Sequence, residues 1–143
     1  MNRKDWALLA ICAANGRGLS PVQLQKTLFL LGREMPHAVG STFYKFRPYH
    51  YGPFDRAVYV DADELANTGD VAITQRHGET WNRYLATAEG CERASILRST
   101  APPGTVSYLD RLIEWALRQS FQSLVRAIYE KYPEMRANSV FQG

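Results

Sequence analysis

The chain has 143 residues, of which 45% are apolar and 22% are charged, and its formal net charge is +3. These values are typical of one globular domain and exclude an intrinsically disordered chain, which would have fewer apolar residues and more net charge. The small excess of basic residues permits contact with nucleic acid without requiring it, because a dedicated phosphate-binding domain usually concentrates more positive charge.

The N-terminal segment is predicted to be a helix. Apolar residues recur at the helical period between Lys4 and Ala14, and Asn15 and Gly16 end the pattern. The apolar run over residues 7–14 is too short for a bilayer span or for the apolar part of a typical signal peptide. We therefore expect a cytoplasmic protein without a membrane contact.

A second helix has a clear start signal. Ser20 is its predicted N-cap, Pro21 its first residue and Gln23 the third position of a capping box, and the helix runs to about Glu34. The residues on its predicted apolar face are Leu24, Thr27, Leu28, Leu31 and Met35. The polar residues predicted to point away from that face are Gln23, Gln25, Lys26 and Arg33. Two helices joined by a short glycine-containing turn are consistent with the first part of a helix-turn-helix.

An aromatic segment and a third helix follow. The residues Phe43 to Phe46 predict a short strand that ends at Arg47 and Pro48. From Pro53 to about Thr68 the apolar residues return to the helical period, and a glycine ends the helix. The motif Tyr51, Gly52, Pro53 and Phe54 sets the turn into this helix. Its aromatic residues either fill the core beneath the helix or form a stacking surface.

A β-hairpin is predicted directly after the third helix. Its tip lies at Arg76, His77 and Gly78, and its second strand places Trp81 and Leu85 on one face with Tyr84 on the other. Three helices followed by a hairpin are in the order of a winged helix. The predicted fold class is therefore α+β, mainly α, with a winged-helix core.

Helices are also predicted for the rest of the chain. A fourth helix begins near Thr87, although Gly90 occupies the position where a capping box would have Glu or Gln. The proline- and glycine-containing residues 99–106 predict a linker, which separates a winged-helix-like domain (1–98) from a C-terminal helical extension (107–143). Two helices in the extension are strongly apolar on one face, so we expect them to pack on the first domain or on a partner chain, including a second copy.

Nothing in the sequence predicts a complete catalytic site. The three histidines, His37, His50 and His77, have no metal-ligand spacing, and the serines and glycines match no hydrolase elbow or nucleotide-binding loop. We therefore expect a protein that is not an enzyme and that needs no cofactor. A hydrolase with a site near His50 and Tyr51 is a distant alternative.

Two further groups of reactive side chains have plain interpretations. Asp61, Asp63 and Glu64 lie within about one helical turn and partly on opposite faces, so we expect a solvated acidic surface rather than a metal site. Cys12 and Cys91 have neither a CxxC spacing nor a nearby histidine pair, and we expect reduced thiols in the core.

Binding is the other use of this predicted architecture. The candidate contact residues are Arg17, Lys26 and Arg33 around the second helix and Arg76, His77 and Arg83 on the hairpin. The third helix has four acidic residues, Asp55, Asp61, Asp63 and Glu64, and Arg56 is its one basic residue. Because phosphates would repel such a helix, the pattern favours either DNA contact through the hairpin and second helix, or a winged helix that binds protein.

Four segments carry a resemblance to a known family. They are LQKTLFLL (24–31), FYKF (43–46), YHYGPFDRAVYVDADELANTGDVAI (49–73) and the closing IYEKYPEMRANSVF (128–141). Together they resemble the YwgA-type and SocA-like (Panacea) antitoxin-related family. The resemblance implies a winged-helix-like fold without enzymatic activity in a bacterial or prophage setting, and some relatives act as antitoxins or as proteolytic adaptors that bind another protein.

These observations predict a non-enzymatic regulator of the antitoxin or adaptor type. Its expected partner is a toxin or another protein from the same operon, with DNA as a further candidate. The alternative is a dimeric winged-helix transcriptional regulator that binds operator DNA and dimerises through the C-terminal helices.

Overall fold

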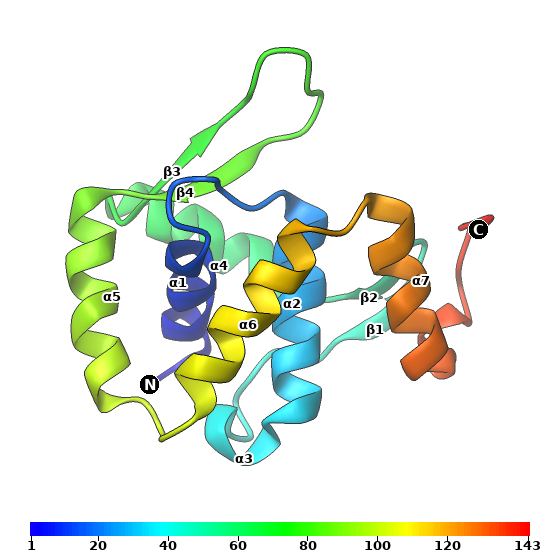
Figure 1. Cartoon of the computed structure of the whole chain (residues 1–143), viewed down its shortest axis with the longest axis horizontal. Helices are drawn as coiled ribbons and strands as arrows, with labels where there is room; N and C mark the ends of the chain where they lie inside the picture. Colours follow the sequence, from blue (N-terminus) through cyan, green and yellow to red (C-terminus); the bar gives the residue numbers. More distant parts are fainter.

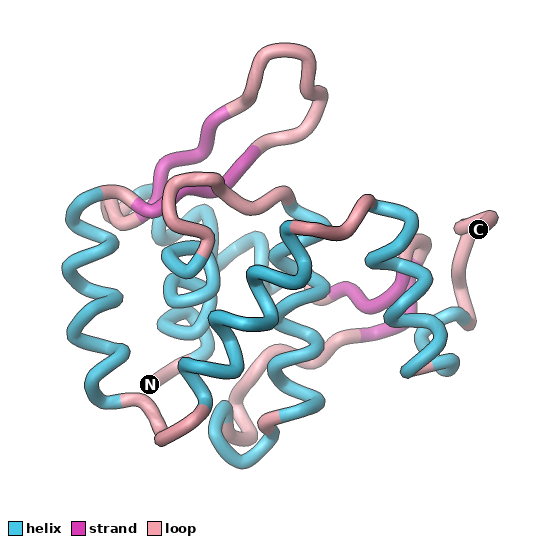
Figure 2. Tube along the Cα trace, in the orientation of Figure 1, coloured by secondary structure: helices cyan, strands magenta, loops and turns pink.

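The computed structural model describes all 143 residues and is mainly helical, with two antiparallel two-stranded sheets (Figures 1 and 2). The helices are α1 (Arg3–Ala13), α2 (Pro21–Glu34), α3 (Pro36–Val39), α4 (Arg56–Asn67), α5 (Ala88–Thr100), α6 (Thr105–Leu117), α7 (Phe121–Lys131) and the 3-10 helix η1 (Pro133–Arg136). The strands are β1 (Arg47–Tyr49), β2 (Gly52–Phe54), β3 (Val71–Thr74) and β4 (Arg83–Ala86). The predicted α+β, mainly α class is confirmed. None of the helices combines the length and the apolar composition that a bilayer span requires.

The helix α1 lies at the centre of the fold and contacts α2, α4, α5 and α6. In Figure 1, α6 crosses in front of α2 and passes beside α1, and α4 lies behind α1. One apolar cluster joins Trp6 and Leu28 to Leu109, Ile113 and Val125, so the predicted C-terminal extension packs on the rest of its own chain. The apolar faces of α6 and α7 are thereby buried. The connection before α6 is shorter than the predicted linker, because α5 continues to Thr100 and α6 begins at Thr105.

The predicted bounds of α2 are confirmed, and so is its capping box. The hydroxyl of Ser20 accepts a hydrogen bond from the Gln23 N–H (3.2 Å), and the Gln23 side chain accepts one from the Ser20 N–H (2.9 Å). The prediction that Gln25 and Lys26 point into solvent is wrong, since only 1% and 4% of their surfaces are exposed. The side chain of Gln25 forms two hydrogen bonds with the backbone of Asp55, and the Lys26 amine donates to the Pro53 carbonyl (3.1 Å). A segment nearly thirty positions away in sequence therefore covers this side of α2.

The short strand lies a few residues later than predicted. Residues 43–46 form no strand; the Lys45 N–H donates instead to the Asp55 carboxylate (2.7 Å). The observed strand β1 pairs with β2, and Pro48 faces Pro53 in the register, so both missing N–H groups fall at the same pair and the other pairs keep theirs. Pro53 is thus a strand residue rather than the predicted first residue of the third helix. That helix, α4, begins at Arg56 because the Asp55 carboxylate caps the Ala57 N–H (2.9 Å).

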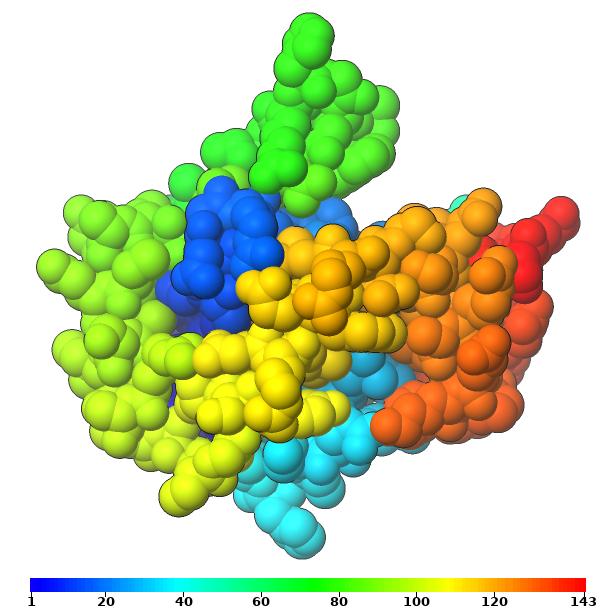
Figure 3. Space-filling view, in the orientation of Figure 1, coloured from blue at the N-terminus to red at the C-terminus, as the bar shows by residue number.

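The strands β3 and β4 form the predicted hairpin, which projects from the body of the molecule (Figure 3). Its turn lies at His77 and Gly78, as predicted. The predicted place of Trp81 in the second strand is wrong, because β4 begins at Arg83. Trp81 lies instead in the projecting loop between β3 and β4. Leu19, between α1 and α2, pairs with Tyr84 through two backbone hydrogen bonds of 3.0 and 2.9 Å, so the hairpin gains a one-residue third strand.

The predicted start of the fourth helix is confirmed, and the structure explains its glycine. The Thr87 hydroxyl caps α5 by accepting a hydrogen bond from the Gly90 N–H (3.0 Å). A Cβ atom at Gly90 would lie 1.9 Å from the carbonyl oxygen of Asp70. Gly90 is therefore required by the close approach of α5 to the residue before β3.

Candidate interaction surfaces

Most of the predicted contact residues have acidic partners or are buried. Arg17 pairs with Glu114, Arg33 with Glu134 (3.6 Å) and Arg83 with Glu79 (2.9 Å). Lys26 is buried, which corrects its prediction as a contact residue. The guanidinium of Arg83 lowers the pKa of Glu79, as expected for a carboxylate held beside a cation. These ion pairs leave little free positive charge at the predicted positions.

The structure does not gather the six predicted residues on one surface. Arg76 and His77 lie exposed on the hairpin, and the Arg76 guanidinium donates to the carbonyl of Arg17. Arg33 lies in the last turn of α2, about 20 Å along the helix axis from its N-cap. Its guanidinium covers the rings of Phe29 and Tyr132 at 5.0 and 4.9 Å. The hairpin tip is thus the one predicted contact region that remains accessible and without an acidic partner.

The acidic surface predicted for the third helix is largely absent. Asp61 is buried, and its carboxylate accepts hydrogen bonds from Tyr44 (2.6 Å) and Arg3 (3.2 Å). Glu64 is paired with Lys4 (3.1 Å), and the Asp55 carboxylate is occupied by two backbone N–H groups. Of the four acidic residues, Asp63 is exposed without such a bond. The outer face of α4 is therefore much less acidic than its sequence implies.

Removing the hydroxyl of Tyr44 is expected to destabilise the fold. Tyr44→Phe should lower the free energy of unfolding by about 1 to 2 kcal/mol, because the buried Asp61 carboxylate loses a donor. Urea unfolding measures this change. Tyr108→Phe is the matched control, since the Tyr108 side chain is half-buried and its hydroxyl makes no hydrogen bond in the structure. Equal stability of the two variants would contradict the role of the Tyr44–Asp61 bond.

An apolar groove of about 500 Å³ lies where the hairpin loop, the start of α2 and the start of α7 meet. Its lining residues are Ser20, Pro21, Val22, Gln23, Trp81, Arg83, Gln119, Ser120, Phe121 and Leu124. The side chains of Trp81 and Phe121 are 45% and 42% exposed, whereas Leu124 is buried. The polar residues of the lining include Arg83, Gln23 and the two capping serines. Because these segments lie far apart in the sequence, no local pattern predicted the groove.

The aromatic motif has two separate roles. Gly52, with φ +101°, and Pro53 are buried in the β1–β2 hairpin, which agrees with a structural role. Tyr51 is exposed, with its ring 5.2 Å from that of Phe121. His50 is exposed and stacks on Tyr49 at 4.1 Å. The His50 ring makes no hydrogen bond that would orient it as a base, so we find no geometry in support of the hydrolase alternative.

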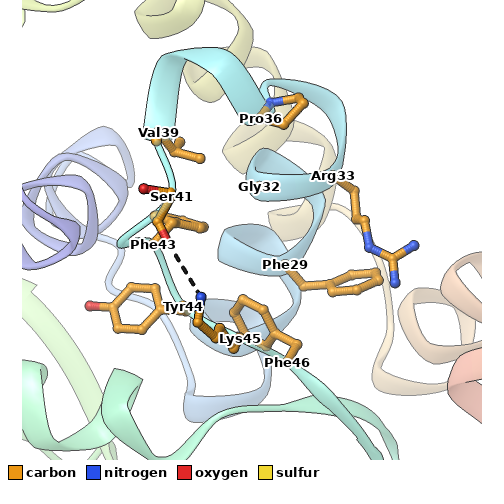
Figure 4. A pocket seen from close by; sticks show the side chains of 11 residues that line it. Phe29, Gly32, Arg33, Pro36, Val39, Ser41, Phe43, Tyr44, Lys45 and Phe46 are labelled. Atoms are coloured by element: carbon orange, nitrogen blue, oxygen red, sulfur yellow. Dashed lines mark hydrogen bonds between the residues drawn. The ribbon is translucent and has the colours of Figure 1, made fainter.

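Two other cavities offer no arrangement of side chains that would bind a ligand. The cavity in Figure 4, of about 330 Å³, lies between α2, α3 and residues 41–46. Phe29, Phe43 and Phe46 line it, and the Arg33 side chain points away from Phe43. The dashed line marks its one drawn hydrogen bond, from the Lys45 amine to the Ser41 carbonyl (3.3 Å). This space is a gap between packed aromatic side chains.

The second of these cavities, of about 340 Å³, is bordered by both cysteines. Cys12 and Cys91 are free, as predicted, but Cys91 is exposed rather than in the core. Burial and the neighbouring Cys91 thiol raise the pKa of Cys12 to about 12, so Cys12 is a thiol at neutral pH. Its reactivity is correspondingly low.

Comparison with known proteins adds no assignment. Neither the protein-family models nor the curated proteins include a match to the chain. No three His, Cys, Asp or Glu side chains come together in an arrangement that could hold a metal ion. The surfaces of the molecule, above all the groove lined by Trp81 and Phe121, are therefore the remaining indication of its function.

Proposed function

We propose that this protein is a non-enzymatic regulator of the antitoxin or adaptor type, which binds a segment of a partner protein in the Trp81–Phe121 groove. One observation carries the proposal: two large aromatic side chains, from segments far apart in the sequence, stay exposed in the lining of one apolar groove. Exposed tryptophan and phenylalanine around a concave apolar floor, with a polar rim, are typical of protein interfaces.

The order of elements supports a winged-helix core for this regulator. The helices α1, α2 and α4 precede the β3–β4 hairpin, and Leu19, between the first two helices, pairs with β4. The helix α3 and the β1–β2 hairpin form an insertion between the second and third helices. The resemblance to YwgA-type and SocA-like proteins is in keeping with this arrangement and with protein binding.

The groove also favours a particular partner chemistry. The helices α2 and α7 both begin at its rim, and neither has an acidic residue in its first turn. The positive ends of the two helix dipoles therefore face the groove without a compensating charge. The occupant is a segment that places one or two large apolar side chains beside an acidic residue.

The alternative, a dimeric transcriptional regulator that uses the predicted contact residues, has less support. Arg17, Arg33 and Arg83 are ion-paired and Lys26 is buried. The apolar faces of α6 and α7 are buried in the chain itself, so a dimer would need another surface. No observation favours this alternative over the groove.

The test is a selection from a randomised peptide library displayed on phage, with the whole chain as target. We expect the selected sequences to combine a large apolar residue with Asp or Glu. Trp81→Ala should weaken a selected peptide by about 2 kcal/mol or more, roughly 30-fold, because the exposed ring forms one wall of the groove. Isothermal titration calorimetry measures the loss.

The matched control is Ile96→Ala, since Ile96 is 69% exposed on α5, away from the groove. This variant should bind as the unchanged chain does, and both variants should unfold at the same temperature. Failure to select any peptide, or equal binding by the Trp81 and Ile96 variants, would contradict the proposal.

A further inference from the structure

A second surface of the molecule has the opposite chemistry to the groove. Lys45, Arg47 and Arg56 line one cavity of about 430 Å³ between the β1–β2 hairpin and the start of α4. All three residues are exposed, and none of the ion pairs of the chain includes them. The Lys45 amine has one hydrogen bond, to the carbonyl of Ser41. Three cations thus face one cavity without an acidic partner.

The acidic residue in this cavity does not cancel their charge. One oxygen of the Asp55 carboxylate accepts from the Lys45 N–H (2.7 Å), and the other accepts from the Ala57 N–H (2.9 Å). These bonds fix the orientation of the carboxylate but leave its negative charge. Because three cations stand against this one carboxylate, the cavity keeps a net positive charge and is suited to an anionic ligand.

The surface beside the cavity is a continuous helical stripe. Arg56, Val60, Asp63 and Asn67 follow one another at helical spacing, and all four are exposed. The helix α4 is about 18 Å long, and an α-helix of this kind fits the major groove of B-DNA. Asp61 is buried and Glu64 is paired with Lys4, so Asp63 is the one free carboxylate of the stripe and the helix repels a phosphate backbone less than its sequence implies.

We propose that Lys45, Arg47 and Arg56 bind backbone phosphates of duplex DNA and thereby place the exposed stripe of α4 against the major groove. This site is made of other elements than the Trp81–Phe121 groove and does not depend on it. Its three cations are also different from the six that the sequence predicted.

The aromatic residues of the cavity favour a duplex over single-stranded nucleic acid. The ring of Tyr49 stacks on His50 at 4.1 Å with an interplanar angle of 11°, and it lies 5.2 Å from Phe54. Phe54 in turn packs against Tyr59. Because His50 and Phe54 already pack against Tyr49, less of its ring surface is free for unpaired bases, on which single-strand binding depends.

The experiment is a fluorescence anisotropy titration of a labelled, random-sequence DNA duplex over a series of KCl concentrations. Three phosphate contacts predict a slope of about −3 in a plot of the logarithm of the association constant against that of the salt concentration. The triple variant Lys45→Glu, Arg47→Glu, Arg56→Glu should bind at least tenfold more weakly and lose most of this slope.

The matched control is the triple variant Arg111→Glu, Arg118→Glu, Arg126→Glu. Arg111 lies on α6, Arg118 directly after it and Arg126 on α7; all three are exposed and have no ion pair, and their replacement gives the same net charge. In Figure 1, α6 lies on the opposite side of the molecule from α4. The control should keep a slope within about one of the unchanged chain. Circular dichroism checks that each variant is folded. If a Glu variant is not folded, the corresponding Gln variant is used in its place, and the same change in slope is expected.

Several results would overturn the proposal. They are the absence of duplex binding at low salt, an equal loss in the two triple variants, and tighter binding of the single strand than of the duplex. Binding of polyglutamate that competes with the duplex and depends on the same three residues would assign the surface to an acidic protein instead.

Discussion

Replacement of Gly90 by alanine should lower the free energy of unfolding by about 3 kcal/mol or more. The added Cβ would lie 1.9 Å from the carbonyl oxygen of Asp70 and 2.9 Å from its carbonyl carbon. This obstacle is backbone, and the same oxygen accepts a hydrogen bond from the Thr87 N–H (3.1 Å), so it is held in place. Helix propensity alone would favour alanine by about 1 kcal/mol. A large loss of stability would therefore be caused by the clash with the Asp70 carbonyl and not by a change in helix propensity.

Urea unfolding of two further variants separates this contact from general effects. In Gly32→Ala the new Cβ would lie 2.8 Å from a ring carbon of Phe43, a side chain that can shift, so the loss should be smaller than for Gly90. Cys91→Ala changes an exposed residue in the same turn of α5 and should alter stability by less than about 0.5 kcal/mol. A Gly90→Ala chain as stable as the unchanged one would show that α5 and Asp70 are not in contact.

Local signals in the sequence were sufficient for several elements. The capping box of Ser20 and Gln23 specifies its own hydrogen bonds, and the start of α2 follows from it. Gly69 follows the third helix with φ +86°, a conformation that residues with a side chain rarely adopt, so a glycine here marks the end of the helix. Both features depend on residues within a few positions of one another, and interactions of this kind can be predicted from the sequence alone.

Other features depend on contacts between distant segments and were therefore missed. Gln25 and Lys26 look like solvent-facing residues of an amphipathic helix, yet residues 53–55 cover them and supply their hydrogen-bond partners. The two prolines of the β1–β2 hairpin look like strand breakers until they are seen to face each other. The groove needs residues 20–23, 81–83 and 119–124 together, a combination that no periodicity encodes.

Charge gives the clearest case of this limit. By residue type, Arg17 is a good anion contact, but Glu114, 97 positions later, neutralises it. Arg56 is close in sequence to four acidic residues, yet the carboxylates of Asp55, Asp61 and Glu64 have other partners in the fold. Which charges are available to a ligand is a property of tertiary pairing, so the sequence alone could not show that Arg17 is paired and that Arg56 is not.

Lys26→Met should stabilise the protein at neutral pH, by about 2 kcal/mol. Burial lowers the pKa of Lys26 to about 8 from an ordinary value of 10.5, because a buried ammonium is poorly solvated. Below pH 8 the lysine is protonated in both states, and the folded state bears the full cost of burying the charge. Methionine removes that cost and also removes the hydrogen bond to the Pro53 carbonyl, which offsets about 1 kcal/mol of the gain.

The pH dependence of this stability difference shows whether the buried charge of Lys26 causes it. Between pH 8 and 10.5 the unfolded chain binds more protons at Lys26 than the folded one, so the stability of the unchanged protein rises with pH. The advantage of Lys26→Met should shrink over this range and, above it, turn into a loss of about 1 kcal/mol, since only the missing hydrogen bond to the Pro53 carbonyl remains. Urea unfolding at several pH values measures this, with the exposed Lys45→Met as control. A Lys26→Met chain less stable than the unchanged protein at every pH would show that the buried amine carries no charge penalty.

The same variant also separates the two sets of cations. Lys26 is 4% exposed, so its removal should leave the affinity for duplex DNA unchanged, whereas reversal of the exposed Arg47 and Arg56 should lower it. Weaker binding by a stably folded Lys26→Met chain would mean that the β1–β2 hairpin opens to expose the amine when DNA is bound. Unchanged binding together with higher stability would assign Lys26 to the interior, where its amine holds the Pro53 carbonyl.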